Sequence, residues 1–422
     1  MSAFAPKPFF AALFQAAVAA ADPERGIRAF LPDRPKGRTI VIGAGKGAAQ
    51  MARALERVWD GPLEGVVVTR YGYAVACARI EVIEAAHPVP DAAGLAGANR
   101  LFQAVAGLTA DDLVIALISG GGSALLPAPP AGMTLDDEIA VNRALLASGA
   151  PIAAMNTVRK HLSRIKGGRL AAAAHPARVV SLIVSDIPGD QPSLVSSGPT
   201  VPDAATRADA LAIVAAFHLD LPETALAHLN STAADALLPG DARFARNTVH
   251  IIASAAVSLG AAAAESERLG LPAVILSDAI EGEAREVAKV HAAIAREVAA
   301  RNRPFTRPVA ILSGGETTVT LRAKGGKGGR NAEFLLGLAI AIDGIAGIHA
   351  FAADTDGIDG SEDNAGAFAD GTTAARLRAL GLDPVALLNA NDAWGAFDAL
   401  GDLFVTGPTG TNVNDLRVVV VE

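Results

Sequence analysis

The chain has 422 residues, of which 51% are hydrophobic and 19% charged, enough apolar material for the cores of about two or three domains. Its net charge of -8 argues against a nucleic-acid-binding protein, although it permits a local cationic pocket for an anionic ligand. The single cysteine, Cys77, excludes an intrachain disulfide and a zinc site built from cysteines. This cysteine usage suits a cytoplasmic protein, and no run reaches the ~18 apolar residues of a membrane span.

The N-terminal segment has two interpretations. Lys7 precedes an apolar run that ends in small residues, as in a secretory signal peptide. However, Phe10, Leu13, Phe14 and Ala17 recur at helical spacing, which favours an amphipathic helix. Such a helix could pack on either domain.

Short β-branched runs separated by helix-length segments predict an α/β protein with parallel strands covered on both faces. We expect strands at 39–42, 65–69, 112–119, 179–185, 248–253, 272–276, 309–312 and 348–352. A Leu-Pro-Gly break at 238–240 interrupts the alternation. We therefore predict a doubly wound α/β domain at 1–240 and a second domain at 241–422.

Residues that follow strands are the candidates for ligand binding, because ligands of open α/β sheets bind beyond the carboxyl ends of the strands. Five predicted strand ends carry glycine, hydroxyl, cationic or carboxylate residues. Glycine-rich turns expose consecutive N–H groups that can surround phosphate oxygens. The candidates for phosphate or nucleotide binding are Gly45, Ser119, Gly120, Gly121, Gly122, Ser123, Gly314, Gly315 and Lys327.

The loop at 43–47 has three interpretations. Gly43-x-Gly45-x-x-Ala48 matches the relaxed dinucleotide fingerprint, but the next strand ends at Thr69-Arg70, where that fingerprint has an acidic residue. The loop also lacks the spacing of a Walker P-loop. It could instead hold Lys46 at a helix N-terminus as an anion site, or form an ordinary tight turn with a solvated lysine.

Carboxylates follow two other predicted strands. Asp186 and Asp190 flank a Pro-Gly turn, and Asp354 and Asp356 lead a second acidic stretch. Carboxylates beside phosphate-binding loops suit Mg²⁺, so Asp186, Asp190 and Asp356 are candidate ligands. The rest of that stretch, 359–363, is expected to be a solvated loop.

Two cationic segments complete the set. The stretch 325–330, GGKGGR, places four glycines around Lys327 and ends at Arg330, which indicates a loop whose backbone approaches an anion. The stretch 156–170 predicts a helix with a solvated basic face, ending at Gly167-Gly168.

Together these motifs resemble one family, the glycerate 2-kinases with a C-terminal MOFRL domain, whose members also carry the name hydroxypyruvate reductase. The resemblance covers roughly residues 8–422 and lies in NTVRKHLSRIKGGRLA, SLIVSDIPGD, SSGPTVPD, LSGGETTVTL, GKGGRNAEF, AADTDGIDG and TGPTGTNVNDL. It implies a Rossmann-like first domain, a mixed-sheet second domain and an active site in the cleft between them. It also implies an ATP-dependent kinase that phosphorylates the 2-hydroxyl of D-glycerate.

The resemblance implies functions for particular residues. Lys46 and Arg330 are the expected catalytic cations, and Asn331 is expected beside them at the substrate. We expect Lys46 to neutralise charge on the transferring phosphoryl group, and Arg330 to clamp that group or the glycerate carboxylate. Asp186 is expected to bind Mg²⁺ or to accept the hydroxyl proton.

One alternative function is kept, an NAD(P)H-dependent hydroxypyruvate reductase, because of the glycine pattern at 43–48. The expected partners are D-glycerate and ATP with Mg²⁺, without nucleic acid or membrane. The sequence leaves the oligomeric state open, with a homodimer as a candidate.

Overall fold

The computed structural model describes residues 4–187, 189–322 and 325–422. It forms two compact units, Pro23–Ile252 (the N-terminal unit) and Met1–Asp22 with Ala253–Glu422 (the C-terminal unit). The predicted ranges 1–240 and 241–422 differ from these units at two places. The segment before residue 23 belongs to the C-terminal unit, and the strand after residue 247 extends the sheet of the N-terminal unit.

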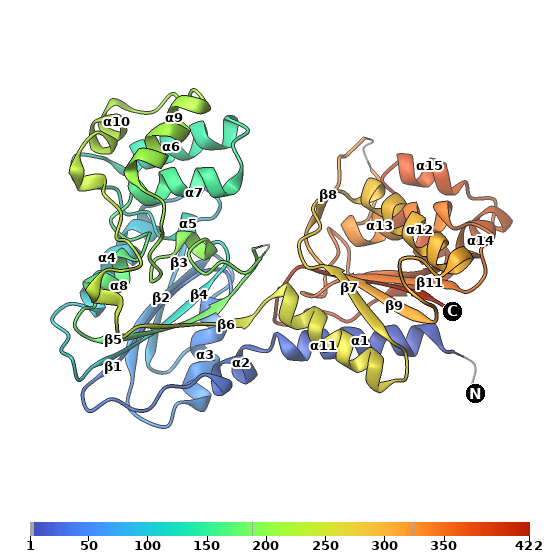
Figure 1. The fold of residues 1–422 in the computed structure, drawn as a ribbon, viewed down its shortest axis with the longest axis horizontal. Coiled ribbons are helices and arrows are strands. Elements are labelled where there is room, and N and C mark those ends of the chain that lie inside the picture. Colours follow the sequence, from blue (N-terminus) through green and yellow to red (C-terminus); the bar gives the residue numbers. More distant parts are fainter. Residues whose placement is uncertain (1–3, 188, 323–324) are drawn as a thin grey trace. The chain divides into compact units, whose positions relative to one another are not determined.

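The N-terminal unit is built on a six-stranded sheet of order β3-β2-β1-β4-β5-β6 (Figure 1). Its strands are β1 (Thr39–Ala44), β2 (Glu64–Arg70), β3 (Ile80–Ala85), β4 (Leu113–Ser119), β5 (Arg178–Val184) and β6 (Thr248–Ala253). The pairs β1–β2, β2–β3, β1–β4 and β4–β5 are all parallel. This is the strand order of doubly wound dinucleotide-binding folds, and it confirms the predicted Rossmann-like architecture.

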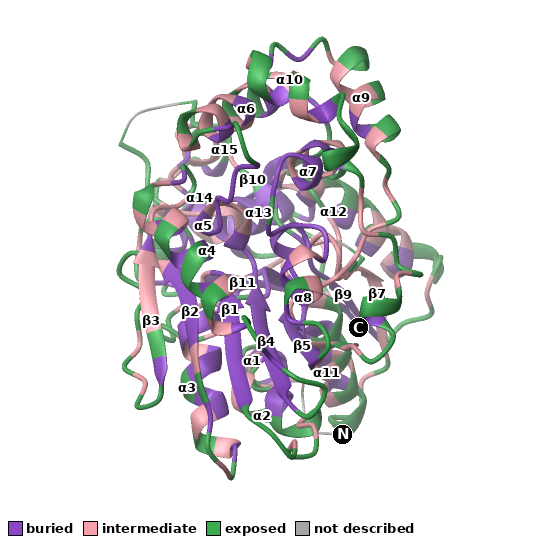
Figure 2. Cartoon of the chain, turned by 90° about the vertical axis from the view of Figure 1, so that its left-hand side faces the viewer, coloured by how far each residue is buried: buried purple, intermediate pink, exposed green. Residues whose placement is uncertain are grey.

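Both faces of this sheet are covered, as continuous apolar strands predict. Ile40 and Ile42 pack into one core with α4 and α8, whereas Val41 packs into another with α3. Figure 2 shows β1 and β4 buried along their length. The helices of this unit are α2 (Pro23–Ala29), α3 (Ala48–Val58), α4 (Ala92–Ala104), α5 (Gly122–Leu125), α6 (Leu135–Ala147), α7 (Ile152–His161), α8 (Arg169–Ala173), α9 (Arg207–Ala216) and α10 (Glu223–Leu229), with short 3₁₀ turns η1 (Val195–Ser197), η2 (Thr232–Ala234) and η3 (Ala242–Phe244).

The C-terminal unit contains a mixed six-stranded sheet of order β13-β12-β11-β14-β9-β7. Its strands are β7 (Ala273–Ser277), β9 (Val309–Ser313), β11 (Ile348–Asp354), β12 (Gly366–Asp370), β13 (Leu403–Phe404) and β14 (Asp415–Val421), and a separate pair is formed by β8 (Gly282–Glu283) and β10 (Thr317–Thr318). Only the β7–β9 pair of the six-stranded sheet is parallel. This arrangement confirms the mixed sheet implied by the resemblance.

Helices cover both faces of the mixed sheet. They are α1 (Pro6–Ala20), α11 (Ala255–Arg268), α12 (Ala284–Arg301), α13 (Arg330–Ala341), α14 (Thr373–Ala379), α15 (Pro384–Asn389) and α16 (Ala393–Leu400). The predicted N-terminal helix is α1. Its Phe10 ring stacks on Phe351 at 5.6 Å, and Ser258 of α11 donates a hydrogen bond to the carbonyl of Ala17 (2.9 Å). These contacts explain why α1 belongs to the C-terminal unit.

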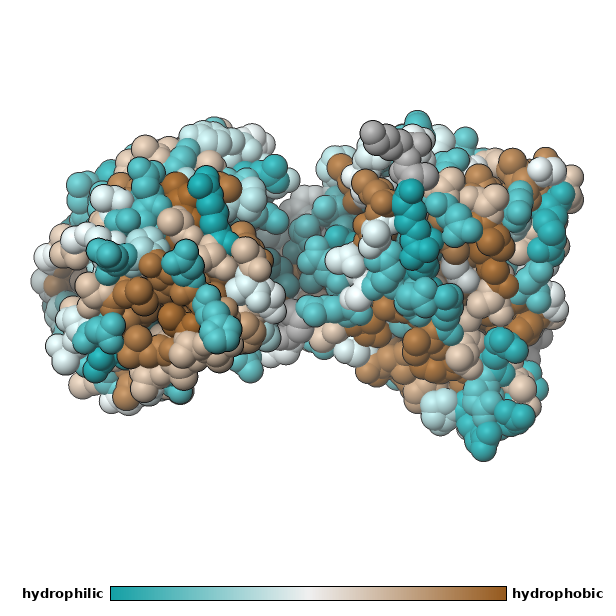
Figure 3. All heavy atoms as spheres, turned by 90° about the horizontal axis from the view of Figure 1, so that it is seen from above, coloured by the Kyte–Doolittle hydropathy of each residue, from teal (hydrophilic) through white to brown (hydrophobic). Residues whose placement is uncertain are grey.

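The surface of each unit mixes polar and apolar side chains (Figure 3). Leu146 of the N-terminal unit and Leu321 of the C-terminal unit are exposed apolar examples. Across the described residues, no helix is both long and apolar enough to cross a membrane.

Candidate functional site

The first candidate cluster lies beyond the carboxyl ends of β1 and β4, neighbouring strands at which the strand order reverses. The loop after β1 is bound to the turn after β4. The Lys46 N–H donates to the carbonyl of Gly120 (2.8 Å), and the Gly47 N–H donates to Ser119 Oγ (2.9 Å). The Gly45 N–H donates to the carbonyl of Val68 (3.1 Å). These three amides therefore bind the protein itself, not a ligand.

The glycines of the same loop are needed for packing against β4. A Cβ at Gly45, where φ is +132°, would overlap the carbonyl oxygen of Ser119. A Cβ at Gly43 would overlap that of Leu117. The Gly-x-Gly pattern is thus accounted for by the contact between β1 and β4, without a pyrophosphate.

The Lys46 backbone N–H is bound within the protein, but its side-chain ammonium makes no ion pair with the described residues. Among the described residues, no carboxylate lies within 4 Å of its ammonium. A Cβ placed at Gly121 would lie 3.1 Å from Lys46 Cγ and 3.2 Å from His87 Nε2, so both side chains border the space that this glycine leaves open. Lys46 is therefore a cation held at the edge of the sheet with its charge uncompensated.

His87 was missed by the sequence analysis. It follows β3, a strand that the sequence did not predict, so its carboxyl end was not searched. Burial, with smaller contributions from Lys46 and Arg70, lowers the pKa of the His87 imidazole below its ordinary value. The ring is therefore neutral near pH 7. The signal in the sequence is a histidine directly after IEVIEAA.

The turn at 120–123 is supported by two serines of η1. The Gly122 N–H donates to Ser196 Oγ (2.9 Å), and Ser196 Oγ donates in turn to the carbonyl of Ser119. Ser123 Oγ shares a hydrogen bond of 2.5 Å with Ser197 Oγ. Both η1 serines have positive φ, at 52° and 59°, a conformation that non-glycine residues rarely adopt and that the surrounding contacts must stabilise. The hydroxyls of Ser119 and Ser123 are thus engaged within the protein.

Asp186 lies against this turn. A Cβ on Gly120 would overlap its carboxylate, so the absence of a side chain at Gly120 makes room for Asp186 beside the turn. Asp190, four residues further on, has φ +49°. Among the described residues, no group of three histidine, cysteine or acidic side chains is arranged to hold a metal ion. A divalent cation at Asp186 would therefore need ligands from a bound substrate.

The second candidate cluster surrounds Arg330, the first residue of α13. Its Nε donates to Asp415 Oδ1 (2.8 Å), its Nη1 to Glu316 Oε1 (3.0 Å) and its Nη2 to Asp354 Oδ2 (2.7 Å). All three guanidinium nitrogens thus contact carboxylates. Arg330, which we predicted to clamp an anion of the substrates, holds three acidic side chains in this structure.

Asp415 joins this cluster to the interior. It also accepts a hydrogen bond from Asn331 Nδ2 (2.8 Å) and pairs with Arg417. Asn331 and Arg417 have no exposed surface. Burial places the Asn331 amide among protein atoms, so this conformation gives it no contact surface for a substrate.

Two aspartates of the second cluster have raised pKa values. Burial raises the pKa of Asp354 to about 8 against the attraction of Arg330, and the nearby charges of Asp415 and Asp356 add to the rise. Burial also raises the pKa of Asp359 to about 6. Asp356 itself accepts a hydrogen bond from the N–H of Ile358 (2.8 Å). The cluster holds more carboxylates than cations, and a proton on Asp354 relieves that excess.

The expectation of a solvated loop at 359–363 is wrong at its first residue. Asp359 is fully buried and accepts hydrogen bonds from the N–H groups of Asn331 (2.9 Å) and Ala332 (2.8 Å) in the first turn of α13. A carboxylate there satisfies amides that the helix leaves unpaired. Asp363, by contrast, is exposed as predicted.

The other predicted phosphate ligands of this unit have protein partners. Lys327 Nζ pairs with Glu362 Oε2 (3.2 Å) and lies 4.8 Å from the centre of the Trp394 ring. Gly315, with φ +110°, leaves room for the backbone of Ile280, and the Gly314 N–H donates to the carbonyl of Ser277 (2.8 Å). These glycines are explained by packing.

We predict that Asp359→Ala lowers the free energy of unfolding by at least about 2 kcal/mol, because two buried amides of α13 lose their acceptor. The measurement is urea unfolding at pH 8, where Asp359 is ionised. Asp363→Ala is the matched control and should change stability by less than about 0.5 kcal/mol. Equal effects of the two substitutions would contradict the capping function of Asp359.

Two family models match this chain, one over most of the N-terminal unit and one within the C-terminal unit. Residues 9–230 match a family described as a domain of unknown function (DUF4147), and residues 309–415 match the MOFRL family. A protein of Agrobacterium vitis, provisionally named a hydroxypyruvate reductase, is 54% identical over 97% of this chain and 93% of its own. A glycerate 2-kinase of Pyrococcus horikoshii is 41% identical over 92% of this chain and 88% of its own.

A solved structure is similar over the full length. The crystal structure of the glycerate kinase of Thermotoga maritima matches with a TM-score of 0.89 and 38% identity, over 99% of each chain. The fold, the two matched domains and the identities agree with the motif resemblance. The chain therefore belongs to the glycerate 2-kinase family with a C-terminal MOFRL domain.

Proposed function

We propose that the protein transfers a phosphoryl group from ATP to the 2-hydroxyl of D-glycerate, giving 2-phospho-D-glycerate and ADP. The observation that carries this proposal is the uncompensated Lys46 ammonium beside the Gly121 turn at the switch point of a Rossmann-like sheet. Phosphoryl transfer depends on positioning and on neutralising charge, which a fixed cation in a glycine turn supplies. The kinase names of the relatives support the same reaction.

In this proposal Lys46 neutralises charge on the transferring phosphoryl group. Arg330 binds an anionic group of the substrates when one of its three carboxylates gives way. Glu316 is the one to do so, because its side chain is 57% exposed, whereas those of Asp354 and Asp415 are buried. An exposed ion pair contributes only about 0–1 kcal/mol, so a substrate anion can replace it.

In this proposal Asp186 is the protein ligand that would hold Mg²⁺. Its carboxylate occupies the space that Gly120 leaves open next to the predicted phosphate turn. Mg²⁺ uses one or two protein carboxylates together with phosphate oxygens and waters, so it does not require three clustered acids. When bound, the ion would neutralise phosphate charge. Asp190 and Asp356 stay predicted ligands.

We propose that His87 accepts the proton of the 2-hydroxyl. Its lowered pKa keeps the imidazole unprotonated near pH 7, and Nε2 borders the same open space as Lys46. In the proposed step the glycerate O–H bond breaks and the proton moves to Nε2. The oxygen forms a bond to the γ-phosphorus as the bond to the β–γ bridging oxygen breaks, and ADP leaves.

The alternative function, an NAD(P)H-dependent hydroxypyruvate reductase, has less support. The amides of residues 45–47 are bound to the protein, and Arg70 ends β2 in place of the acidic residue that binds an NAD ribose. An arginine there suits a 2′-phosphate, so NADPH is the cofactor to test.

The reaction is tested by ³¹P NMR of a mixture of the protein, ATP, MgCl₂ and D-glycerate. We expect a new phosphate-ester signal that couples to the proton on C2, together with ADP. A parallel assay follows NADPH and NADH absorbance with hydroxypyruvate. If either nicotinamide cofactor is oxidised and no phosphate ester forms, the kinase proposal is wrong and the reductase proposal is supported.

We predict that Lys46→Ala lowers kcat by about 10²–10³, because one group that stabilises transition-state charge is lost. The melting temperature should change little, since the ammonium makes no ion pair with the described residues. Lys289→Ala, which removes an exposed lysine paired with Glu286, is the control and should keep wild-type turnover. Near-normal turnover in Lys46→Ala would exclude the proposed role.

We predict that His87→Gln lowers kcat/KM by about 10²–10⁴ and removes the acidic limb of its pH profile. Wild type should lose activity as pH falls through the lowered pKa of His87, because the protonated ring cannot accept the hydroxyl proton. A purely structural histidine would lower activity by the same factor at every pH. Persistence of the acidic limb in His87→Gln would assign that titration to another group.

A further inference from the structure

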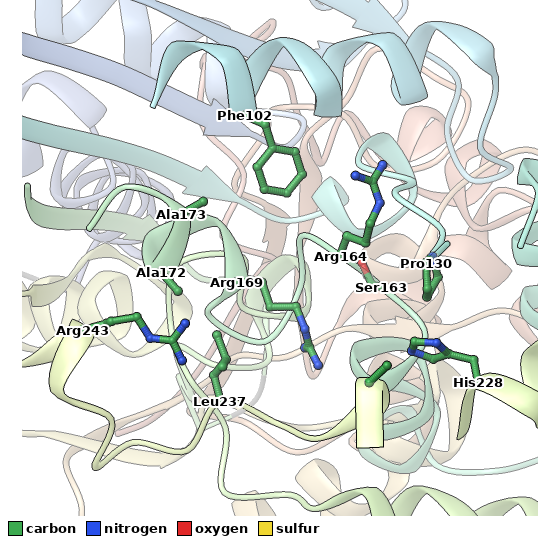
Figure 4. Close-up of a pocket in the computed structure, with 11 residues that line it drawn as sticks. Phe102, Pro130, Ser163, Arg164, Arg169, Ala172, Ala173, His228, Leu237 and Arg243 are labelled. Carbon is green, nitrogen blue, oxygen red and sulfur yellow. The ribbon is translucent and has the colours of Figure 1, made fainter. Parts of the chain in front are cut away.

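A second cavity of the N-terminal unit lies apart from the residues described above. It is an open pocket of about 400 Å³ among the end of α4, helix α8 and the segment from α10 to η3 (Figure 4). Lys46, His87, Asp186 and residues 120–123 are not in its lining. Its size falls within the ~300–1,000 Å³ of small-molecule sites.

The polar lining of this cavity is basic. Arg164, Arg169, Arg243 and His228 all contribute to it, and none of its described lining residues is acidic. Figure 4 shows the side chains of Arg169 and Arg243 on either side of Leu237. A cavity lined by one sign of charge favours a ligand of the opposite sign.

Arg169 is the central cation of this cavity, because its charge has no counterion among the described residues. Its Nη1 donates to the carbonyls of Lys160 (3.0 Å) and Lys166 (3.2 Å), and its Nη2 donates to the carbonyl of Asp235 (3.1 Å). In the described chain no carboxylate lies within 4 Å of it, and burial lowers its pKa. A half-buried guanidinium held only by carbonyl oxygens stays electrostatically attractive to an anion.

The other two arginines keep hydrogen-bonding capacity toward the cavity. Arg164 donates through Nε to the carbonyl of Pro129 (2.9 Å) and lies 5.9 Å from the centre of the Phe102 ring. Its Nη groups make no hydrogen bond with the described residues. Arg243 donates through Nε and Nη2 to Asp241 (2.9 and 2.6 Å), which leaves its Nη1 without a hydrogen bond to the described residues.

Apart from Ser163, the remaining lining is apolar. Phe102, Pro130, Leu237 and the methyl groups of Ala172 and Ala173 complete the cavity. A bare inorganic ion would leave this surface unused, whereas an organic anion would cover it as its charged end reaches the arginines. The lining therefore selects for an anion attached to a small carbon skeleton.

The fold explains why Arg164 faces the cavity. The predicted helix at 156–170 ends early, at His161, and its predicted solvated basic face is wrong for two residues. Lys160 and Lys166 are buried and pair with Asp203 and Glu138. Lys160 lies in α7 and Lys166 in the turn that follows it, and this turn leaves Ser163 and Arg164 at the cavity wall.

We propose that this cavity is a second ligand site of the protein, which binds a small organic phosphate through Arg164, Arg169 and Arg243 and its carbon skeleton through Phe102 and Leu237. The proposal does not depend on the proposed kinase reaction, since none of these residues has a part in it.

The test is calorimetric titration of the full chain with phenyl phosphate. The titration uses the Lys46→Ala variant, so that binding at the first cluster is removed. We expect binding that is weakened about tenfold by Arg164→Gln and by Arg243→Gln, the loss of one charge-assisted hydrogen bond each. Arg28→Gln, which removes an exposed arginine of the same unit paired with Glu24, should bind like its parent.

Inorganic phosphate should bind more weakly than phenyl phosphate, and Phe102→Ala should abolish that difference. Two results would overturn the proposal. One is the absence of phenyl phosphate binding in Lys46→Ala, and the other is equal weakening by Arg28→Gln and Arg164→Gln. Two separate arginine variants keep the test decisive if one of them fails to fold.

Discussion

The N-terminal site depends on the backbone contact between the loop after β1 and the turn after β4. Gly45 and Gly43 lack the side chains that would separate the two strands' ends, and the Lys46 N–H is bound to the carbonyl of Gly120. This contact fixes the Lys46 backbone, so its side chain enters the site from a rigid support. The same turn, because it consists of glycines, admits the His87 ring on one side and the Asp186 carboxylate on the other. One packing constraint therefore positions a cation, a neutral imidazole and a carboxylate.

The sequence predicted the parts of this site that follow strong strand signals. Lys46, the turn at 120–123 and Asp186 all follow continuous apolar strands, which are easy to recognise. His87 follows β3, whose sequence IEVIEA is interrupted by Glu81 and Glu84 and is buried only at its two end residues, at the edge of the sheet. The supporting serines of η1 belong to no strand or helix pattern, and their strained backbone is a product of tertiary contacts.

In the C-terminal unit, the sequence failed to predict a strand for a different reason. The central strand β14 was not predicted, although DLRVVVV is strongly apolar and follows the turn-rich segment GPTGTN, and nothing local in it indicates the two distant partners, β11 and β9, with which it pairs. Without β14, Asp415 and Arg417 had no place in the prediction, and Arg330 seemed free to bind a substrate. The predicted boundary near 240 differs from the division after Ile252 for a similar reason, since no local signal shows that the strand at 248–253 joins the sheet of the N-terminal unit. Pairing over long sequence distances decides what a local pattern leaves open.

The two cations that the family resemblance singles out therefore have opposite electrostatic surroundings. Lys46 has no carboxylate within reach in the described chain, so an approaching phosphate meets its full charge without displacing a partner. Arg330 is held by three carboxylates, and burial, with smaller contributions from the charges of Asp415 and Asp356, raises the pKa of Asp354. An anion can approach Arg330 only if the negative charge there falls, either by release of the exposed Glu316 or by protonation of Asp354. We propose that Lys46 binds phosphate without displacing a partner, whereas anion binding by Arg330 depends on the state of its own carboxylates.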